Sequence, residues 1–535
     1  AAAIEVVESM TKDALDDDLT EIKIVLKDDD GKPLSEEKIP QVLEELLDEA
    51  TPFMKGLVLD TIGVTNSTNT STAAIELSNF LKANDVNLAD LDKIEEQYNK
   101  LAGTKMNQMA EIFLPESARD EYEEPSEEQL LLFRDEILDG LYSTPDAPRK
   151  VLGGYFLRGT DIKGNTTELL RIMNERLEAS SLKDKISVYY LPGFYFQLGA
   201  DETEDEFDDR VEFEDEGTVF YVTSSNVVPD RNPIFRSLIS LMAIGSCWAT
   251  SFAPIMADDS IRDAMGKQLD LLNTGIDVDF SYVTDQSIPL FFALLGIQAA
   301  HELGHKVAAS TNKMEIAFPT LLPSPFLGIT GAITGLKKPP KTNTELFDFA
   351  IAGPLAGMAC SVLTLCVGLF LTSHADAAAI ASFPQLGLGF LRQSQLGGAV
   401  IEQFLPNSLF VPSGAESIMN ELKLSLHPLA IGGYMGMFIN AMSLFPYGRT
   451  DGGRISTAIS GRGLTTVIGN IAILSLMLGA FLDDYRVFLV YLFTYYFFQG
   501  ELEIPAENEV DDISDDRKIL GIAAICVGLA TILPM

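Results

Sequence analysis

Two histidines four residues apart, His301 and His305, are the residues of this chain best suited to metal chemistry. With Glu302 between them they form the motif H-E-x-x-H. Residues four apart on an α-helix point in nearly the same direction, so both imidazoles can reach one Zn²⁺ ion. Glu302 lies beside these ligands but points elsewhere, where it can accept a proton from a water molecule. The motif therefore predicts a zinc-dependent hydrolase.

The motif is specific, because the chain holds only four histidines. A chance match is expected on the order of 0.003 times in such a sequence. The alternative is a histidine pair that is hydrogen-bonded inside a helix bundle. The motif also lies in an apolar run, where ionisable side chains are costly and are functional by default.

A catalytic zinc ion usually has three protein ligands and one open position. Asp451 is the best candidate for the third ligand, because it follows an apolar run in a segment rich in proline and glycine that can turn a carboxylate inward. His374 and His427 are the other choices, but they lie in or beside polar loops. A helix-capping aspartate is the alternative for Asp451.

The second half of the chain contains the long apolar segments that a membrane protein requires. A spanning helix needs about 20 mostly apolar residues. Seven runs approach or meet this length: 233–257, 288–310, 346–371, 428–446, 465–482, 487–498 and 519–534. We predict an α-helical polytopic membrane protein with about six to eight spans.

Charge separates the two halves of the chain. Residues 1–230 carry a net charge of −31 and residues 231–535 a net charge of −9. We expect an acidic soluble region at 1–150, a small α/β soluble domain at 151–230 and a transmembrane metalloprotease domain at 231–535. Within the first region, residues 19–27 read as a strand and residues 35–50 as a helix. An acidic surface excludes nucleic-acid binding, which needs lysine and arginine to neutralise phosphates.

Several motifs together resemble the site-2 proteases, a family of intramembrane zinc metalloproteases, and within it the plastid EGY group. The resemblance covers about residues 150–535. It rests on the following segments of the sequence: 156–164, 301–305, 322–325, 328–334, 353–357 and 440–455.

The resemblance implies a role for each candidate residue. Asp451 is the third zinc ligand and Glu302 the catalytic base. Residues 318–334 form a membrane-reentrant β-hairpin, whose edge can pair with an unwound substrate strand; a plain proline-rich loop is the alternative. The resemblance also implies that four residues contact the substrate: Asn440, Ser443, Gly328 and Gly331. The family usually has Asn where this chain has Ser443, and Asn440 lies one helical turn earlier.

The predicted function is hydrolysis of peptide bonds within or next to the transmembrane segments of membrane proteins, with Zn²⁺ as cofactor. The partners are then a membrane-protein substrate and the lipid bilayer. The alternative is a proteolytically silent scaffold or assembly subunit of a photosynthetic membrane complex. The resemblance implies a plastid membrane, either the thylakoid or the inner envelope.

Overall fold

The computed structural model describes the second half of the chain almost completely and parts of the first. The described ranges are 125–144, 148–151, 153–162, 164–192, 218–224, 233–411, 422–482 and 486–535. The strand expected at 19–27 and the helix expected at 35–50 lie outside these ranges. The chain divides into two compact units: residues 138–164 fall in one, and residues 165–191 with 220–535 fall in the other.

The elements before residue 225 are short helices and strands. In chain order they are α7 (Glu127–Leu132), η1 (Phe133–Ile137), β1 (Tyr142–Ser143), β2 (Arg149–Val151), β3 (Gly154–Asp161), α8 (Thr166–Ala179), β4 (Ile186–Pro192) and β5 (Thr218–Ser224). Helix α8 begins at Asn165, whose side chain accepts a hydrogen bond from the backbone N–H of Glu168 at 3.1 Å. Such a cap satisfies a helical N–H that lacks a partner within the helix. Residues 154–192 thus follow the order strand, helix, strand.

Strands β1 and β2 both pair antiparallel with β3. The register places Lys150 opposite Tyr155 and Val151 opposite Gly154. These pairings join residues 149–151 to residues 154–156 and residues 142–143 to residues 160–161.

The rest of the chain is mostly helical. The elements are α9 (Pro233–Met256), α10 (Asp259–Asn273), α11 (Ser281–Thr311), β6 (Thr320–Ser324), β7 (Gly328–Ile333), α12 (Asn343–His374), α13 (Ala377–Ser382), β8 (Gln385–Gly387), α14 (Leu388–Leu391), α15 (Gln395–Phe404), β9 (Lys423–Ser425), α16 (Pro428–Ser443), α17 (Asp451–Leu482), α18 (Arg486–Phe498) and α19 (Asp515–Ile532). Each of the seven predicted apolar runs is helical over most of its length.

Four helices among the described residues are long and apolar enough to cross a membrane: α9, α11, α12 and α17. The other three apolar helices differ in length or charge. Helix α16 has 16 residues and α18 has 13, while α19 begins with Asp515 and Asp516. The structure thus supports an integral membrane protein with at least these four candidate spans.

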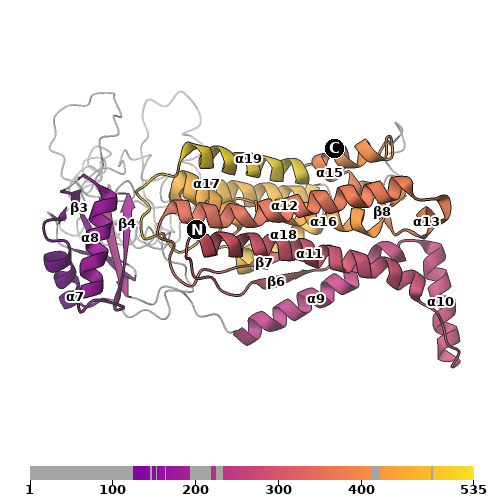
Figure 1. Ribbon diagram of the computed structural model, residues 1–535, viewed down its shortest axis with the longest axis horizontal. Coiled ribbons are helices and arrows are strands. Elements are labelled where there is room, and N and C mark those ends of the chain that lie inside the picture. Colours follow the sequence, from indigo (N-terminus) through magenta and orange to yellow (C-terminus); the bar gives the residue numbers. More distant parts are fainter. Residues whose placement is uncertain are drawn as a thin grey trace, which may run out of the picture. The chain divides into compact units, whose positions relative to one another are not determined.

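Helix α16 is the centre of the bundle. Every residue from 430 to 442 is buried, as expected of a helix that is apolar on all sides. It packs against α11, α12 and α19, and α12 also contacts α11 and α17. Figure 1 shows these helices lying side by side. The short length of α16 is consistent with its place inside the bundle.

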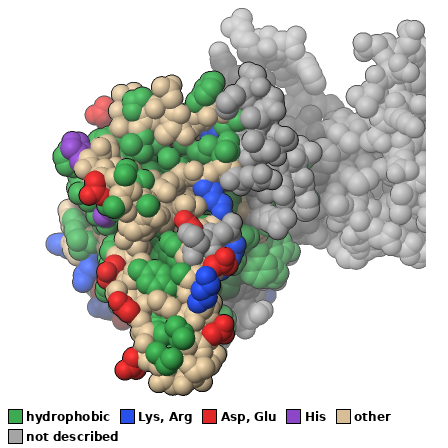
Figure 2. All heavy atoms as spheres, turned by 90° about the vertical axis from the view of Figure 1, so that its right-hand side faces the viewer, with side chains coloured by type: hydrophobic (Ala, Val, Ile, Leu, Met, Phe, Trp, Pro, Cys, Tyr) green, Lys and Arg blue, Asp and Glu red, His purple; other side chains and the backbone are tan. Residues whose placement is uncertain are grey.

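The end of the bundle near α10 and α13 carries mixed side chains. Figure 2, which faces this end, shows acidic and basic groups scattered among hydrophobic ones. Asp376 and His374 lie here and are exposed. By contrast, α9 and α17 expose large apolar side chains along their lengths, including Leu241, Ile471 and Leu474. An apolar flank that ends in a charged face is the pattern expected for a bundle that crosses a bilayer.

A β-hairpin lies beside the helices. Strands β6 and β7 pair antiparallel, and the register shifts between Leu322 and Pro323. The hairpin contacts α9 through both strands, and β7 also contacts α11, α16 and α18. Polar groups of α9 bind β6: Ser240 Oγ accepts from the Leu321 N–H at 3.1 Å, and Ser246 Oγ donates to the Ser324 carbonyl at 2.6 Å. The outer side of β6 is therefore occupied by α9.

Candidate metal centre

Helix α11 brings the two histidines of the motif together. The rings of His301 and His305 lie one helical turn apart, and their Nε2 atoms are 3.0 Å apart. Their exposed fractions are 4% and 2%. Two basic nitrogens that face each other in a buried site need a shared cation or proton, because burial of unpaired polar atoms is costly.

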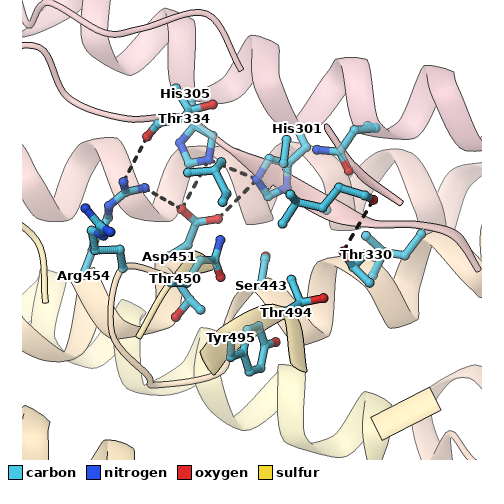
Figure 3. A pocket seen from close by; sticks show the side chains of 18 residues that line it. His301, His305, Thr330, Thr334, Ser443, Thr450, Asp451, Arg454, Thr494 and Tyr495 are labelled. Atoms are coloured by element: carbon cyan, nitrogen blue, oxygen red, sulfur yellow. Dashed lines mark hydrogen bonds and ion pairs between the residues drawn. The ribbon is translucent and has the colours of Figure 1, made fainter. Parts of the chain in front are cut away.

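Asp451 is the first residue of α17, and its carboxylate lies beside both histidines. Its Oδ2 lies 3.2 Å from His301 Nε2 and its Oδ1 lies 3.4 Å from His305 Nε2. One ligand atom from each of the three residues falls within 4.8 Å of the others. Figure 3 shows the three side chains converging on one point. No other such group occurs within the described ranges.

These distances fit a zinc ion. Ligand atoms that bond zinc at about 2.0–2.1 Å in a tetrahedron lie about 3.4 Å from one another. The observed separations of 3.0, 3.2 and 3.4 Å are close to this value. Two histidines and one carboxylate leave one position open, as a catalytic zinc site requires.

The outer nitrogens of both imidazoles have acceptors, which sets their protonation. His301 Nδ1 lies 2.7 Å from the side-chain oxygen of Asn440, and His305 Nδ1 lies 2.9 Å from the carbonyl oxygen of Phe349. An acceptor at Nδ1 places the proton there and leaves the lone pair of Nε2 free for a metal ion. The pair is thus oriented and prepared for metal binding.

Two glycines of α12 make room for this arrangement. A Cβ atom on Gly353 would lie 2.3 Å from His305 Nε2, and one on Gly357 would lie 2.0 Å from the Asn440 side-chain oxygen. Any larger residue would displace the ring or the amide that holds it. The segment 353–357, which contributed to the family resemblance, therefore lines the back of the metal centre.

Glu302 belongs to α11, and its side chain binds Thr334, the residue that follows β7. Its Oε2 accepts a hydrogen bond from Thr334 Oγ1 at 2.5 Å, and its Oε1 accepts one from Gln298 Nε2 at 3.0 Å. Both partners line the cleft in front of the metal centre. The carboxylate is therefore held at the border of the cleft.

A cleft opens in front of His301, His305 and Asp451, and all three line it. Strand β7 forms one wall through residues 330–333, and the other walls come from α11, α16, α17 and α18. Ser443 and Gly331, two of the expected substrate contacts, line it. Figure 3 places Ser443, Thr494 and Tyr495 on the side opposite the histidines.

The other two expected substrate contacts have different surroundings. The Asn440 amide binds His301, a candidate metal ligand, through its oxygen and donates to the Gly436 carbonyl at 2.8 Å. Asn440 is not among the residues that line the cleft. Gly328 lies in the hairpin turn with φ +80°, where a Cβ atom would come within 2.7 Å of Cys247 Cα. Its role is the close packing of the hairpin on α9.

Sequence reasoning missed Arg454 and Thr450. Arg454 is buried and its Nη1 lies 3.4 Å from Asp451 Oδ1. Thr450 Oγ1 accepts from the Gly453 N–H at 2.9 Å and so caps α17, which fixes the place where Asp451 enters the site. A Thr before Asp-Gly-Gly is a capping signal that could have been read. Arg454 offered only its place three residues after Asp451.

Known proteins similar in sequence to this chain include zinc metalloproteases by name, as expected for a zinc site of this kind. Residues 289–481 match the family model of Peptidase family M50. The probable zinc metalloprotease EGY1, chloroplastic, of Arabidopsis thaliana is 32% identical over 268 residues, which cover 48% of this chain and 45% of the relative. The probable zinc metalloprotease EGY2, chloroplastic, of Oryza sativa subsp. indica is 30% identical over 243 residues, which cover 45% of this chain and 41% of the relative.

The chain spans less than half the length of these relatives, and no solved structure matches it. The matched segment holds both histidines, the glutamate between them and Asp451. The resemblance read from the motifs is therefore confirmed: residues 289–481, which hold the candidate metal centre, match the model of Peptidase family M50, and the relatives belong to the EGY group.

Proposed function

We propose that this protein is an intramembrane zinc metalloprotease that hydrolyses peptide bonds within or next to transmembrane segments. The observation that carries the proposal is the buried cluster of His301, His305 and Asp451 beside a cleft, with Glu302 at its border. The zinc metalloproteases among its relatives support the same activity.

The three buried side chains would hold the metal ion. A zinc ion in this position supplies a Lewis acid for the peptide carbonyl and for a water molecule. Glu302 would accept the proton of that water and pass it to the leaving amine. Gln298 and Thr334 hold the two carboxylate oxygens in place and orient the base.

Strand β7 would bind the substrate. A helical substrate segment hides its carbonyls in its own hydrogen bonds, so it must unwind before cleavage. An unwound strand can then pair with the main chain of β7, whose residues 330–333 form a wall of the cleft. Ser443 lies on the cleft and would contact the substrate backbone, as would Gly331. Hairpin residues 318–334 would lie at membrane depth, where only a polar cavity or protein makes such backbone tolerable.

The setting of the enzyme would be a plastid membrane, either the thylakoid or the inner envelope. The chloroplastic relatives support this location. Seven spans, within the predicted six to eight, would result if α16, α18 and α19 also cross the bilayer. The acidic region 1–150 and the segment 151–230 would form soluble parts outside it.

The alternative of a proteolytically silent scaffold of a photosynthetic membrane complex is less well supported. A scaffold has no need for two oriented imidazoles, a converging carboxylate and a positioned base. The intact set of residues favours the enzyme.

The test is the substitution Glu302→Gln. The amide cannot accept the proton of the water, so cleavage of a single-pass substrate should fall by at least about a hundredfold. The probe is a doubly tagged membrane protein with a Gly-Pro-interrupted transmembrane segment, reconstituted with the enzyme in liposomes. Its fragments would be followed by immunoblot. Bound zinc, measured in the same sample, should be unchanged. Cleavage by the variant at the wild-type rate would refute the role of Glu302, and absence of cleavage by the wild type would favour the scaffold.

A further inference from the structure

The loop between α18 and α19 binds the start of α17 through ion pairs. Residues 501–509 of this loop, called here the acidic loop, contain four glutamates. Three of them pair with arginines in or just before α17: Arg449 with Glu501 at 2.9 Å, Arg454 with Glu503 at 2.7 Å and Arg462 with Glu509 at 2.9 Å. The acidic loop is therefore fixed to the helix that supplies Asp451.

The middle pair differs from the other two because it reaches the metal centre. Arg454 donates through Nε and Nη2 to Glu503 Oε2 at 3.0 and 2.7 Å. Its Nη1 donates to Asp451 Oδ1 at 3.4 Å. Its Nη2 also donates to the carbonyl of Thr334 at 2.9 Å, at the end of the hairpin. Figure 3 shows Arg454 beside Asp451, with dashed lines to that carboxylate and toward Thr334.

Glu503 is the nearer carboxylate partner of Arg454, at 2.7 Å compared with 3.4 Å for Asp451. Arg454 is 3% exposed and Glu503 is 5% exposed, so water screens neither group well. A buried cation without its partner is strongly unfavourable. Without the Glu503 charge, the guanidinium would draw the Asp451 carboxylate toward itself and compete with a metal ion for the same oxygen. Burial raises the pKa of Glu503, but Arg454 and Arg449 outweigh it and bring that pKa below its ordinary value.

We propose that Glu503, acting through Arg454, is a positioning residue that orients Asp451 toward the metal ion and holds the end of β7 at the cleft. The proposal rests on the proposed function, because it assigns the metal ion to the His–His–Asp cluster. It links three separate segments: α17, the hairpin and the acidic loop. The geometry of one carboxylate ligand thus depends on a residue far from the motif.

The Arg462–Glu509 pair provides a matched control. It joins the same helix to the same loop, and its side chains are equally buried. Glu509 accepts from Arg462 and from the Ala506 N–H, and neither of these partners is a residue of the metal centre. Arg462 also donates to the backbone carbonyl of Glu503 at 2.7 Å, a bond that does not involve the Glu503 side-chain charge. Loss of the Glu509 charge should therefore weaken the fold without altering the metal ligands.

The experiment measures zinc affinity of the full-length protein in detergent, by competition with a chromophoric chelator. Glu503→Gln should lower the affinity about 10- to 100-fold, the usual effect of losing a residue that orients a metal ligand. Glu509→Gln should lower the melting temperature but keep the affinity of the wild type. Arg454→Lys keeps the charge but loses the planar fork, so it should also lower the affinity. This variant serves if Glu503→Gln does not fold.

The inference would be overturned if Glu503→Gln and Arg454→Lys bound zinc with the affinity of the wild type. It would also be overturned if Glu509→Gln lost as much zinc affinity as Glu503→Gln. The measurement needs no substrate, so it separates this inference from proteolysis. A wild type that binds zinc but cuts nothing fails the proposed activity alone. A wild type that binds no zinc fails both.

Discussion

The imidazoles of the H-E-x-x-H motif can act as metal ligands because neighbouring residues hold them and leave them space. Asn440 and Phe349 bind the outer nitrogens. Gly353 contributes by having no side chain: the ring of His305 occupies the volume that a Cβ atom would fill. A small residue at one position of α12 is therefore part of the metal centre although it binds nothing itself.

Gly353→Ala should thus reduce zinc binding. The added methyl group would meet His305 Nε2 at 2.3 Å, and the ring would have to turn away from Asp451. We expect at least a tenfold loss of zinc affinity, since misorientation of one ligand costs about 10- to 100-fold. Gly296→Ala on α11 is the control, because a Cβ atom there meets nothing within 4 Å. Wild-type affinity in Gly353→Ala would show that the ring does not need this space.

Some of these residues could be predicted from the sequence and others could not. A helix fixes the relation of His301 to His305, so their spacing alone predicts a shared ion. The link from His301 to Asn440 joins residues 139 positions apart, and no local pattern encodes it. The resemblance suggested a substrate contact for Asn440, and its hydrogen bond to His301 became visible only in the structure.

At the scale of whole elements, the two strands of the hairpin have different neighbours. The family resemblance predicted a β-hairpin at 318–334, and β6 and β7 occupy this segment. The sequence could not say which strand faces the site. In the structure, α9 binds β6 through Ser240 and Ser246, whereas residues 330–333 of β7 line the cleft together with Leu322 of β6.

Helix lengths show a similar limit. The apolar runs predicted the seven longest apolar helices but not α10, α13, α14 or α15, and the extent of α17 was unexpected. It begins at Asp451, and non-helical backbone at Gly461 divides it. The polar first part, residues 451–460, carries no apolar run and is stabilised instead by the Thr450 cap and the ion pairs to the acidic loop.

Gly331→Ala should impair substrate use without affecting the metal ion. Gly331 has φ +146° and lines the cleft. A side chain at this φ costs about 1–3 kcal/mol of backbone strain, so β7 should shift away from the geometry that pairs with a substrate strand. We expect kcat/KM for the liposome substrate to fall about tenfold with zinc content unchanged. Gly335→Ala, with no positive φ and open space around its Cβ position, should be near wild type. Equal kcat/KM for Gly331→Ala and the wild type would argue against β7 as the substrate strand.

At the scale of the whole molecule, most of the negative charge lies in residues 1–230, whereas the residues of the proposed mechanism lie in the second half of the chain. All residues of the proposed mechanism lie between 298 and 503. The acidic region would then affect which proteins reach the site, because a strongly negative domain repels acidic soluble regions.

Deletion of residues 1–124 tests this role and leaves the paired strands β1, β2 and β3 intact. We expect the truncated enzyme to cut the liposome substrate at about the wild-type rate and to cut additional proteins with acidic soluble domains. A panel of such substrates, assayed by immunoblot, measures the change. A scaffold predicts the opposite result: the deletion abolishes association with a partner complex, and Glu302→Gln has no effect in the cell.

The central claim is a zinc ion held by His301, His305 and Asp451, and the metal content of the purified protein tests it most directly. Native mass spectrometry of the intact chain should find one zinc ion in the wild type and in Glu302→Gln, because the base is not a ligand. His301→Ala and Asp451→Ala should contain none, with melting temperatures recorded to verify folding. A wild type without zinc, or full zinc occupancy in both ligand variants, would contradict the account.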